Sequence, residues 1–100
     1  MTRHSGHPLT LRLYVAGQTA SARRALESRQ KLLAATADPL TIEIVDILAK
    51  PGEAEAAGIL ATPTLSDETR NPARRLVGDL GDTMQVLDFF GYRKKEEPHP

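Results

Sequence analysis

A strand, a helix and a second strand, read from hydrophobic periodicity, constrain the fold of this chain more than any other feature. Apolar and polar residues alternate over residues 9–16, and this period of two predicts a β-strand. Residues 21–35 carry apolar side chains at helical spacing, and Thr19 or Ser21 can cap this helix. Residues 40–48 are almost continuously apolar, as in a strand covered on both faces. Together they predict a right-handed βαβ unit with parallel strands.

The second half of the chain has shorter and less regular patterns. Residues 53–57 predict a short helix, because Pro51 stands near its start and Gly58 just past its end. Residues 66–72 are polar and predict a loop. Residues 74–77 predict a short strand, which the following glycine and aspartate end.

Residues 82–92 are consistent with two structures. Asp82 and Gln85 have the spacing of a capping box, which favours a helix over residues 83–90. The segment is apolar on nearly every side, however, which equally suits a buried strand. Tertiary context must therefore decide. Asp79 and Asp82 could form a carboxylate pair, but a turn aspartate followed by a helix cap is the stronger interpretation.

The length of 100 residues suits one domain. We place this domain at residues 9–92, between two flexible tails at residues 1–8 and 93–100 that are rich in histidine, proline and charge. All three histidines lie in these tails. His4 and His7 alone do not make a preorganised metal site, so we expect no bound metal and no histidine base.

Composition excludes several functions. Basic and acidic residues balance at 13 each, so no global field attracts nucleic acid or an acidic membrane. The sequence has no apolar run long enough to span a bilayer, no apolar segment of a signal peptide at its start and no phosphate-binding loop. We therefore expect a cytoplasmic protein that holds no cofactor.

The segment Ala-Thr-Pro-Thr-Leu at residues 61–65 resembles the proline turn that faces the active site in thioredoxin-like folds. The chain contains no cysteine, and dithiol chemistry requires a thiolate. If the scaffold is thioredoxin-like, it therefore serves binding. Because about 5–6% of X–Pro bonds in folded proteins are cis, residue statistics predict a trans bond before Pro63, and only the resemblance favours cis.

Two arginine pairs are further candidates for function. Arg23 and Arg24 lie early in the predicted first helix, and Arg74 and Arg75 open a predicted strand. Adjacent side chains diverge on a helix or strand, so one member of each pair should face solvent. The pairs are either ordinary surface charge or a basic rim for an acidic protein partner, because guanidinium groups bind carboxylates in a fork.

Five segments, in order and with matching spacing, make the chain resemble the KaiB family, small clock proteins that act with the ATPase and kinase KaiC. The resemblance extends over about residues 9–90. The segments are residues 13–17, 24–26, 45–48, 59–65 and 74–80.

The resemblance implies a thioredoxin-like α/β domain of βαβαββα order that binds the N-terminal ATPase ring of KaiC. For some members it also implies a second fold of βαββααβ order, usually tetrameric, in which the C-terminal half rearranges. The ambiguous residues 82–92 fit this implication, since they would be a helix in one fold and a strand in the other. Conflicting local preferences leave a gap of a few kcal/mol between two packings.

The resemblance also implies roles for individual residues. Arg24, Arg74 and Arg75 correspond to positions tied to partner binding. Asp46 and Lys50 lie on the side expected to meet KaiC.

A second group would determine the fold. The resemblance places the start of the rearrangement at Gly78 and Asp79, and it makes the proline turn at Pro63 part of the same group. One departure from the family pattern is Arg29, where relatives commonly carry an apolar residue.

We therefore predict a non-enzymatic regulator. It would bind a KaiC-like ATPase or kinase and modulate its phosphorylation or ATPase cycle in a circadian or stress timer. One alternative is a cysteine-less enzyme related to thioredoxin or glutathione transferase, with Ser21 near the expected thiol position but no visible activating group. Another is a sensor module like the KaiB-like domain of a clock-output histidine kinase, which is also a candidate partner. The protein could form a homo-oligomer, and the sequence leaves a dimer and a tetramer as alternatives.

Overall fold

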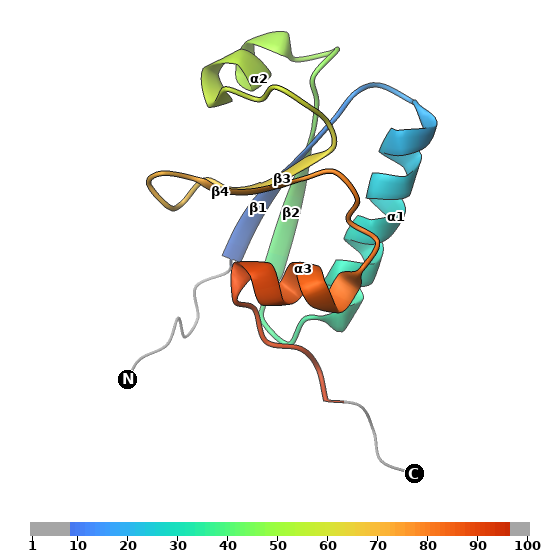
Figure 1. Cartoon of the computed structure of the whole chain (residues 1–100), viewed down its shortest axis with the longest axis vertical. Coiled ribbons are helices and arrows are strands. Elements are labelled where there is room, and N and C mark those ends of the chain that lie inside the picture. The colour runs from blue at the N-terminus through green and yellow to red at the C-terminus, as the bar shows by residue number, and fades with distance from the viewer. Residues whose placement is uncertain (1–8, 97–100) are drawn as a thin grey trace.

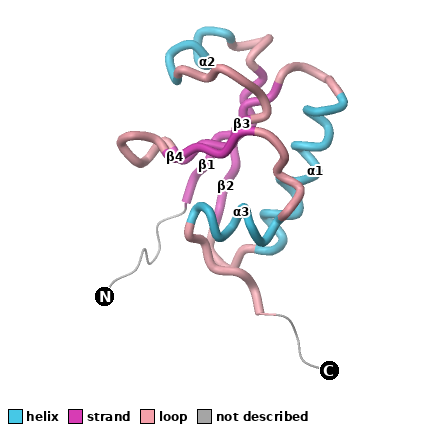
Figure 2. Tube along the Cα trace, in the orientation of Figure 1, coloured by secondary structure: helices cyan, strands magenta, loops and turns pink. Residues whose placement is uncertain are grey.

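A four-stranded sheet with helices packed on it forms the framework of the molecule (Figure 1; Figure 2). The structure is a computed structural model, and it describes residues 9–96. The order βαβαββα confirms the expected thioredoxin-like arrangement, and the alternative order βαββααβ is not the one adopted here. The elements are β1 (Leu9–Val15), α1 (Ala20–Ala35), β2 (Leu40–Asp46), α2 (Pro51–Ala57), β3 (Thr64–Asp67), β4 (Arg74–Val77) and α3 (Thr83–Phe90).

The strand order β2–β1–β3–β4 confirms the predicted βαβ unit. Strand β1 runs parallel to β2, and β3 is antiparallel to both β1 and β4. The prediction that residues 40–48 are covered on both faces is wrong. Strand β2 lies at the edge of the sheet, and Ile44 within it is 48% exposed. The strand ends at Asp46, and Leu48, in the turn that follows, is 69% exposed.

Helix α1 joins the parallel strands and packs on the sheet. Its N-cap is Thr19, one of the two candidates, whose hydroxyl accepts a hydrogen bond from the Ala22 N–H at 3.1 Å. The half-buried Arg29 donates from Nε to the Ile42 carbonyl at 2.8 Å. This departure from the family pattern therefore ties α1 to β2.

Strand β3 includes two residues that the sequence assigned to a loop. Ser66 and Asp67, which were expected to begin a loop, are the last two residues of β3, and both are buried. Local polarity misled the prediction, because pairing with β1 on one side and β4 on the other holds this backbone extended. The polar side chains are satisfied, since Ser66 Oγ accepts from Arg75 Nε at 3.1 Å and Asp67 Oδ1 accepts from the Thr69 N–H at 3.1 Å.

The ambiguous C-terminal segment is a helix. Asp82 caps α3 by accepting a hydrogen bond from the Gln85 N–H at 3.1 Å, and Gly91 ends the helix in the left-handed conformation, with φ at +79°. Asp79 Oδ1 accepts from the Gly81 N–H at 2.8 Å. The two aspartates are thus a turn aspartate and a helix cap, as the stronger interpretation held.

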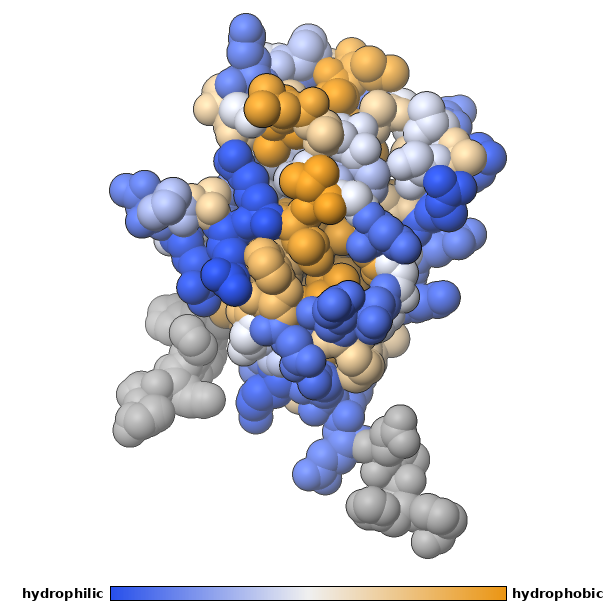
Figure 3. Space-filling model, in the orientation of Figure 1, coloured by the Kyte–Doolittle hydropathy of each residue, from blue (hydrophilic) through white to orange (hydrophobic). Residues whose placement is uncertain are grey.

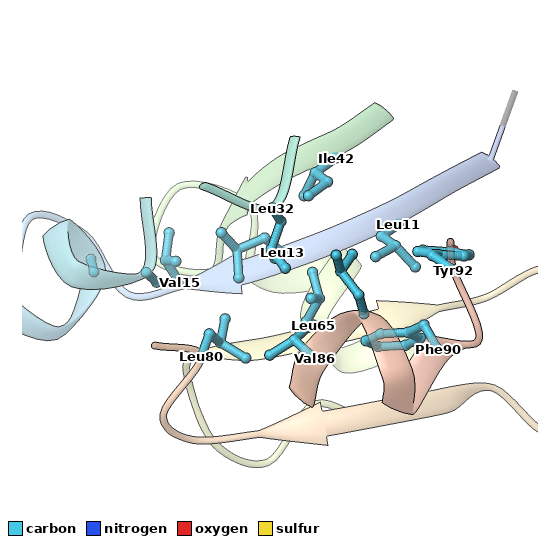
Figure 4. Packing of buried hydrophobic residues seen from close by; sticks show 13 residues of the cluster. Leu11, Leu13, Val15, Leu32, Ile42, Leu65, Leu80, Val86, Phe90 and Tyr92 are labelled. Carbon is cyan, nitrogen blue, oxygen red and sulfur yellow. The ribbon is translucent and has the colours of Figure 1, made fainter. Parts of the chain in front are cut away.

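One apolar core lies between the sheet, α1 and α3 (Figure 4). Every second residue of β1 points into it, and the buried positions of α1 and α3 recur at helical spacing. The core residues are Leu11, Leu13, Val15, Ala22, Ala25, Leu32, Ile42, Leu65, Leu80, Val86, Leu87, Phe90 and Tyr92.

The residues after α3 return to the end of α1. The Ala37 N–H donates to the Arg93 carbonyl at 2.9 Å, and the Lys95 N–H donates to the Ala35 carbonyl at 2.8 Å. Arg93 also forms an ion pair with Asp38 at 3.0 Å. The packed chain therefore extends past residue 92, the expected end of the domain, because the backbone of residues 93–95 pairs with a distant segment. The other tail predictions, with His4 and His7, lie outside the described residues.

No helix in residues 9–96 is long and apolar enough to cross a membrane.

Candidate functional site

A cavity of about 420 Å³ opens beside Pro63, between α1 and the connection from β4 to α3. It brings together four of the predicted site residues, Arg24, Pro63, Gly78 and Asp79, which come from three separate stretches of the sequence. The full lining is Ser21, Arg24, Ala25, Ser28, Pro63, Gly78, Asp79 and Leu80.

The Thr62–Pro63 peptide bond in the wall of this cavity is cis. The trans bond that residue statistics predict is therefore wrong, and the geometry follows the thioredoxin-like resemblance. The statistics ignore tertiary pairing, whereas here the Gly78 N–H donates to the Pro63 carbonyl at 3.0 Å. Gly78 has φ at +104°, a conformation that side chains other than glycine rarely adopt.

The cavity lining includes the hydroxyl that the sequence offered in place of a thiol. Ser21 lies in the first turn of α1 and shares the cavity with Pro63, as expected for the residue nearest the absent thiol. Asp79 is the one carboxylate among the lining residues, which include no histidine or lysine, and the Ser21 hydroxyl makes no hydrogen bond to it. Within residues 9–96, no group of three or more metal-ligating side chains is close enough to hold a metal ion.

Two further predicted partner residues lie at the two ends of the β2–α2 connection rather than at the cavity, Asp46 as the last residue of β2 and Lys50 as the N-cap of α2. Asp46 Oδ1 accepts hydrogen bonds from the Gly17 N–H at 2.9 Å and the Leu48 N–H at 3.0 Å. These backbone donors, Gly17 first, lower the pKa of the Asp46 carboxyl below its usual value. Lys50 is exposed, with Nζ 3.8 Å from Glu53. Asp46 therefore organises two loops, while Lys50 faces solvent.

Arg74 and Arg75 point to opposite faces of the sheet, as adjacent strand residues must. Arg74 donates from Nε to the Phe89 carbonyl at 2.9 Å, and its guanidinium lies 4.4 Å from the centre of the Phe89 ring. Arg75 donates to Ser66 and lies 3.6 Å from Glu68. The exposed Arg74 and the half-buried Arg75 are therefore both engaged inside the molecule.

A polar network on the α2 face of the sheet was not predicted. Tyr14 is fully buried, and its hydroxyl donates to Glu68 Oε2 at 2.7 Å. Burial, and then this hydrogen bond, raise the pKa of Tyr14. Arg12 lies 3.1 Å from Glu43 and 3.5 Å from Glu53 of α2. The members of the polar network are Arg12, Tyr14, Glu43, Glu53, Ser66, Glu68 and Arg75.

One signal for the polar network was present in the sequence. The alternation in residues 9–16 places Arg12 and Tyr14 on the face opposite the leucines, so a polar counterpart on that face could have been anticipated. Nothing local marked Glu68, which follows β3 in a segment that was expected to be a loop.

Apolar surface gathers between α2 and the middle of the molecule in Figure 3. Leu60 is 98% exposed and Val77 is 57% exposed. Both border a shallow hollow of about 160 Å³, which Ile59 and Arg75 also line.

The fold and the cavity define a thioredoxin-like α/β domain that carries a cis-proline turn but no thiol. Residues 12–91 match the model of the KaiB domain family. The chain is 42% identical over 78 residues to the circadian clock oscillator protein KaiB of Prochlorococcus marinus (strain NATL2A), covering 77% of this chain and 73% of that protein. It is 41% identical over 78 residues to KaiB of Synechococcus elongatus (strain ATCC 33912 / PCC 7942), covering 77% and 76%. The chain belongs to the KaiB family.

A solved structure supports the fold independently. The N-terminal domain of Synechococcus elongatus SasA superposes with a TM-score of 0.68 at 20% sequence identity, covering 91% of this chain and 90% of that one. At this level of identity the likeness shows a shared fold. The family prediction and the thioredoxin-like prediction are both confirmed.

Proposed function

We propose that this protein is a non-enzymatic cytoplasmic regulator that binds a KaiC-like ATPase or kinase and modulates its phosphorylation or ATPase cycle. The observation that carries the proposal is the family match over residues 12–91, supported by 42% identity to a circadian clock oscillator protein. The biological setting is a circadian or stress timer.

The five proposed partner residues fall into two groups, one exposed and one held in internal contacts. Arg24 and Lys50 are exposed, and such cations suit acidic groups on a partner. Asp46, Arg74 and Arg75 are held in internal contacts. They would therefore act mainly by shaping the surface that the partner meets.

The direct test mixes the purified protein with the KaiC-like protein encoded in the same genome. Co-elution on size exclusion would be followed with ATP, with ADP and with a slowly hydrolysed ATP analogue. We expect a complex in at least one nucleotide state, with the partner's ATPase or phosphorylation rate altered. No co-elution in any nucleotide state would contradict the proposal.

A matched pair of variants tests the proposed contact residues. Arg24→Glu reverses an exposed charge at the cavity, whereas Arg23→Glu does so one residue away, outside the cavity lining. We expect a tenfold or greater loss of partner affinity for Arg24→Glu, because a lost charge-assisted contact is worth roughly 1.5–3 kcal/mol. Equal losses in both variants would show that only net charge matters.

We also propose that the C-terminal half has a second packing, with Pro63, Gly78 and Asp79 as the positions that determine the fold. The motivating observation is the apolar segment at residues 83–90, which suits a helix or a strand. Amide spectra should then show a second set of signals or slow exchange for the second half of the chain. Light scattering would identify a dimer or tetramer. One set of signals and no detectable minor state would contradict this proposal.

Two other functions are alternatives. The position of Ser21 in the cavity beside cis-Pro63 favours a glutathione-dependent enzyme. Glutathione conjugation above background, lost in Ser21→Ala, would support it. The fold shared with the SasA domain favours a sensor module, for which a clock-output histidine kinase is the partner to test by the same co-elution.

A further inference from the structure

The cavity beside Pro63 carries one charge of each sign on two separate elements. Arg24 comes from α1, and Asp79 comes from the connection between β4 and α3, which passes beside α1 (Figure 1). Two serines and several apolar residues, including Ala25 and Leu80, complete the lining. The cavity volume of about 420 Å³ falls within the range of small-molecule sites, roughly 300–1,000 Å³.

Arg24 differs from the other arginines of the described chain. Each of the others makes a hydrogen bond or an ion pair inside the molecule, including its neighbour Arg23, which donates to the Gln18 carbonyl at 3.3 Å. Arg24 makes neither with any residue in 9–96. Its guanidinium can therefore bind a carboxylate without breaking an internal contact.

The opposite wall offers an acceptor. Asp79 Oδ1 is occupied by the Gly81 N–H at 2.8 Å. Oδ2 makes no hydrogen bond within the described part of the chain. A carboxylate with one committed oxygen is held in orientation, and the second oxygen is left to accept from an ammonium group.

A buried hydroxyl in the same lining also lacks a partner. Ser28 is 8% exposed and lines the cavity, yet its hydroxyl forms no hydrogen bond with residues 9–96. Buried polar side chains are nearly always paired, so an unpaired one calls for an explanation. A ligand atom in the cavity would supply that pair.

We propose that this cavity binds a small zwitterion of the dipeptide class. The ligand carboxylate pairs with Arg24, its ammonium with Asp79 Oδ2, and a backbone amide with the Ser28 hydroxyl. Aliphatic atoms of the ligand pack on Ala25 and Leu80. A simple anion is disfavoured by Asp79, and a simple cation by Arg24.

The experiment is a titration of the whole chain, labelled with nitrogen-15, with the dipeptide glycyl-L-leucine. We expect saturable amide shifts in the millimolar range, clustered at the cavity residues. N-acetyl-glycyl-L-leucine lacks the ammonium and glycyl-L-leucinamide lacks the carboxylate. Each should bind roughly tenfold more weakly, because one charge-assisted contact is lost.

Variants separate this site from nonspecific binding. Arg24→Gln should weaken dipeptide binding roughly tenfold or more, and Ser28→Ala several-fold. Arg23→Gln, just outside the cavity, should leave it unchanged, and unperturbed spectra elsewhere would show that the variants fold. Absent or unsaturable shifts, equal affinity for all three compounds, or equal losses at Arg24 and Arg23 would overturn the proposal. The titration contains no KaiC-like partner, so its outcome is independent of the proposed function.

Discussion

Different interactions stabilise the two faces of the sheet. The face under α1 and α3 is an apolar core, where Leu13 and Leu65 are fully buried. The α2 face carries the polar network around Glu68. Burying one leucine contributes about 1.5–3 kcal/mol, whereas a largely exposed ion pair contributes about 0–1 kcal/mol. The core face therefore holds the domain together, and the α2 face mainly sets geometry.

Helix α2 is held to the sheet by few buried contacts. It buries one residue, Ala54, and the ion pairs of Glu53 link it to Arg12 of the sheet and to Lys50 at its own N-cap. Segments with few buried apolar contacts open at low free energy. We infer that α2 separates from the sheet more readily than α1 or α3.

The largest expected effect comes from a truncation on the core face. Leu13→Ala should lower the free energy of unfolding by about 2–5 kcal/mol, because it leaves a cavity in a packed core. Urea denaturation measures this change. Leu60→Ala, at a side chain that is 98% exposed, is the matched control and should stay within about 0.5 kcal/mol. Similar losses of stability in both variants would contradict the conclusion that the core face holds the domain together.

The second-largest effect is a dependence of the free energy of unfolding on pH, which arises from Tyr92 on the core face. Burial, followed by the nearby Asp67, raises the pKa of Tyr92 to about 12 from its usual 10.0. Between pH 10 and 12 the unfolded chain loses this proton while the folded chain keeps it. The stability from Tyr92 is therefore complete below pH 10 and falls as pH rises, by about 1.4 kcal/mol per unit and roughly 2–3 kcal/mol in total.

Urea denaturation at several pH values measures this slope. In Tyr92→Phe the slope should be shallower by the contribution of this one group. An unchanged slope would mean that Tyr92 ionises in the folded protein as easily as in the unfolded chain.

A smaller effect is expected for the tyrosine on the other face. Tyr14→Phe removes the 2.7 Å hydrogen bond to Glu68 and should cost about 1–2 kcal/mol, since bonds to charged groups exceed neutral ones. Tyr92→Phe at pH 7 is the control, because the Tyr92 hydroxyl makes no hydrogen bond within residues 9–96. It should change stability by less than about 0.5 kcal/mol. A larger loss of stability for Tyr92→Phe than for Tyr14→Phe would contradict the conclusion that the Tyr14 hydroxyl stabilises the fold through its bond to Glu68.

The smallest effect concerns the ion pairs that connect the sheet to α2. Arg12→Gln should cost about 0–1 kcal/mol at low salt, because Arg12 and its partners are substantially exposed. The difference from the wild type should shrink in 1 M NaCl, where the screening length is about 3 Å. A loss above about 2 kcal/mol, or one unaffected by salt, would show that the polar network stabilises the domain as a buried element does.

The described elements differ in how far local sequence predicted them. Strand β1, helix α1 and the caps at Thr19 and Asp82 were predictable, because each depends on residues within a turn or two of one another. The absence of cysteine excludes dithiol chemistry on composition alone. The motif resemblance then led to the KaiB family, which the comparisons confirm.

The candidate site was predictable only residue by residue. Arg24, Pro63, Gly78 and Asp79 were named from motifs, but local patterns did not show that they share one cavity. Ser28 was missed, because a serine in a helix carries no signal that its hydroxyl is buried and unpaired.

The βαβ start, the helix caps and the absence of thiol chemistry follow from neighbouring residues and composition alone. Long-range contacts were needed to establish that residues 83–90 are a helix, that Ser66 and Asp67 belong to a strand, and that the bond before Pro63 is cis. In each of these cases the local preferences are nearly balanced or point the other way. Pairing and packing with residues far along the chain therefore supply the deciding free energy.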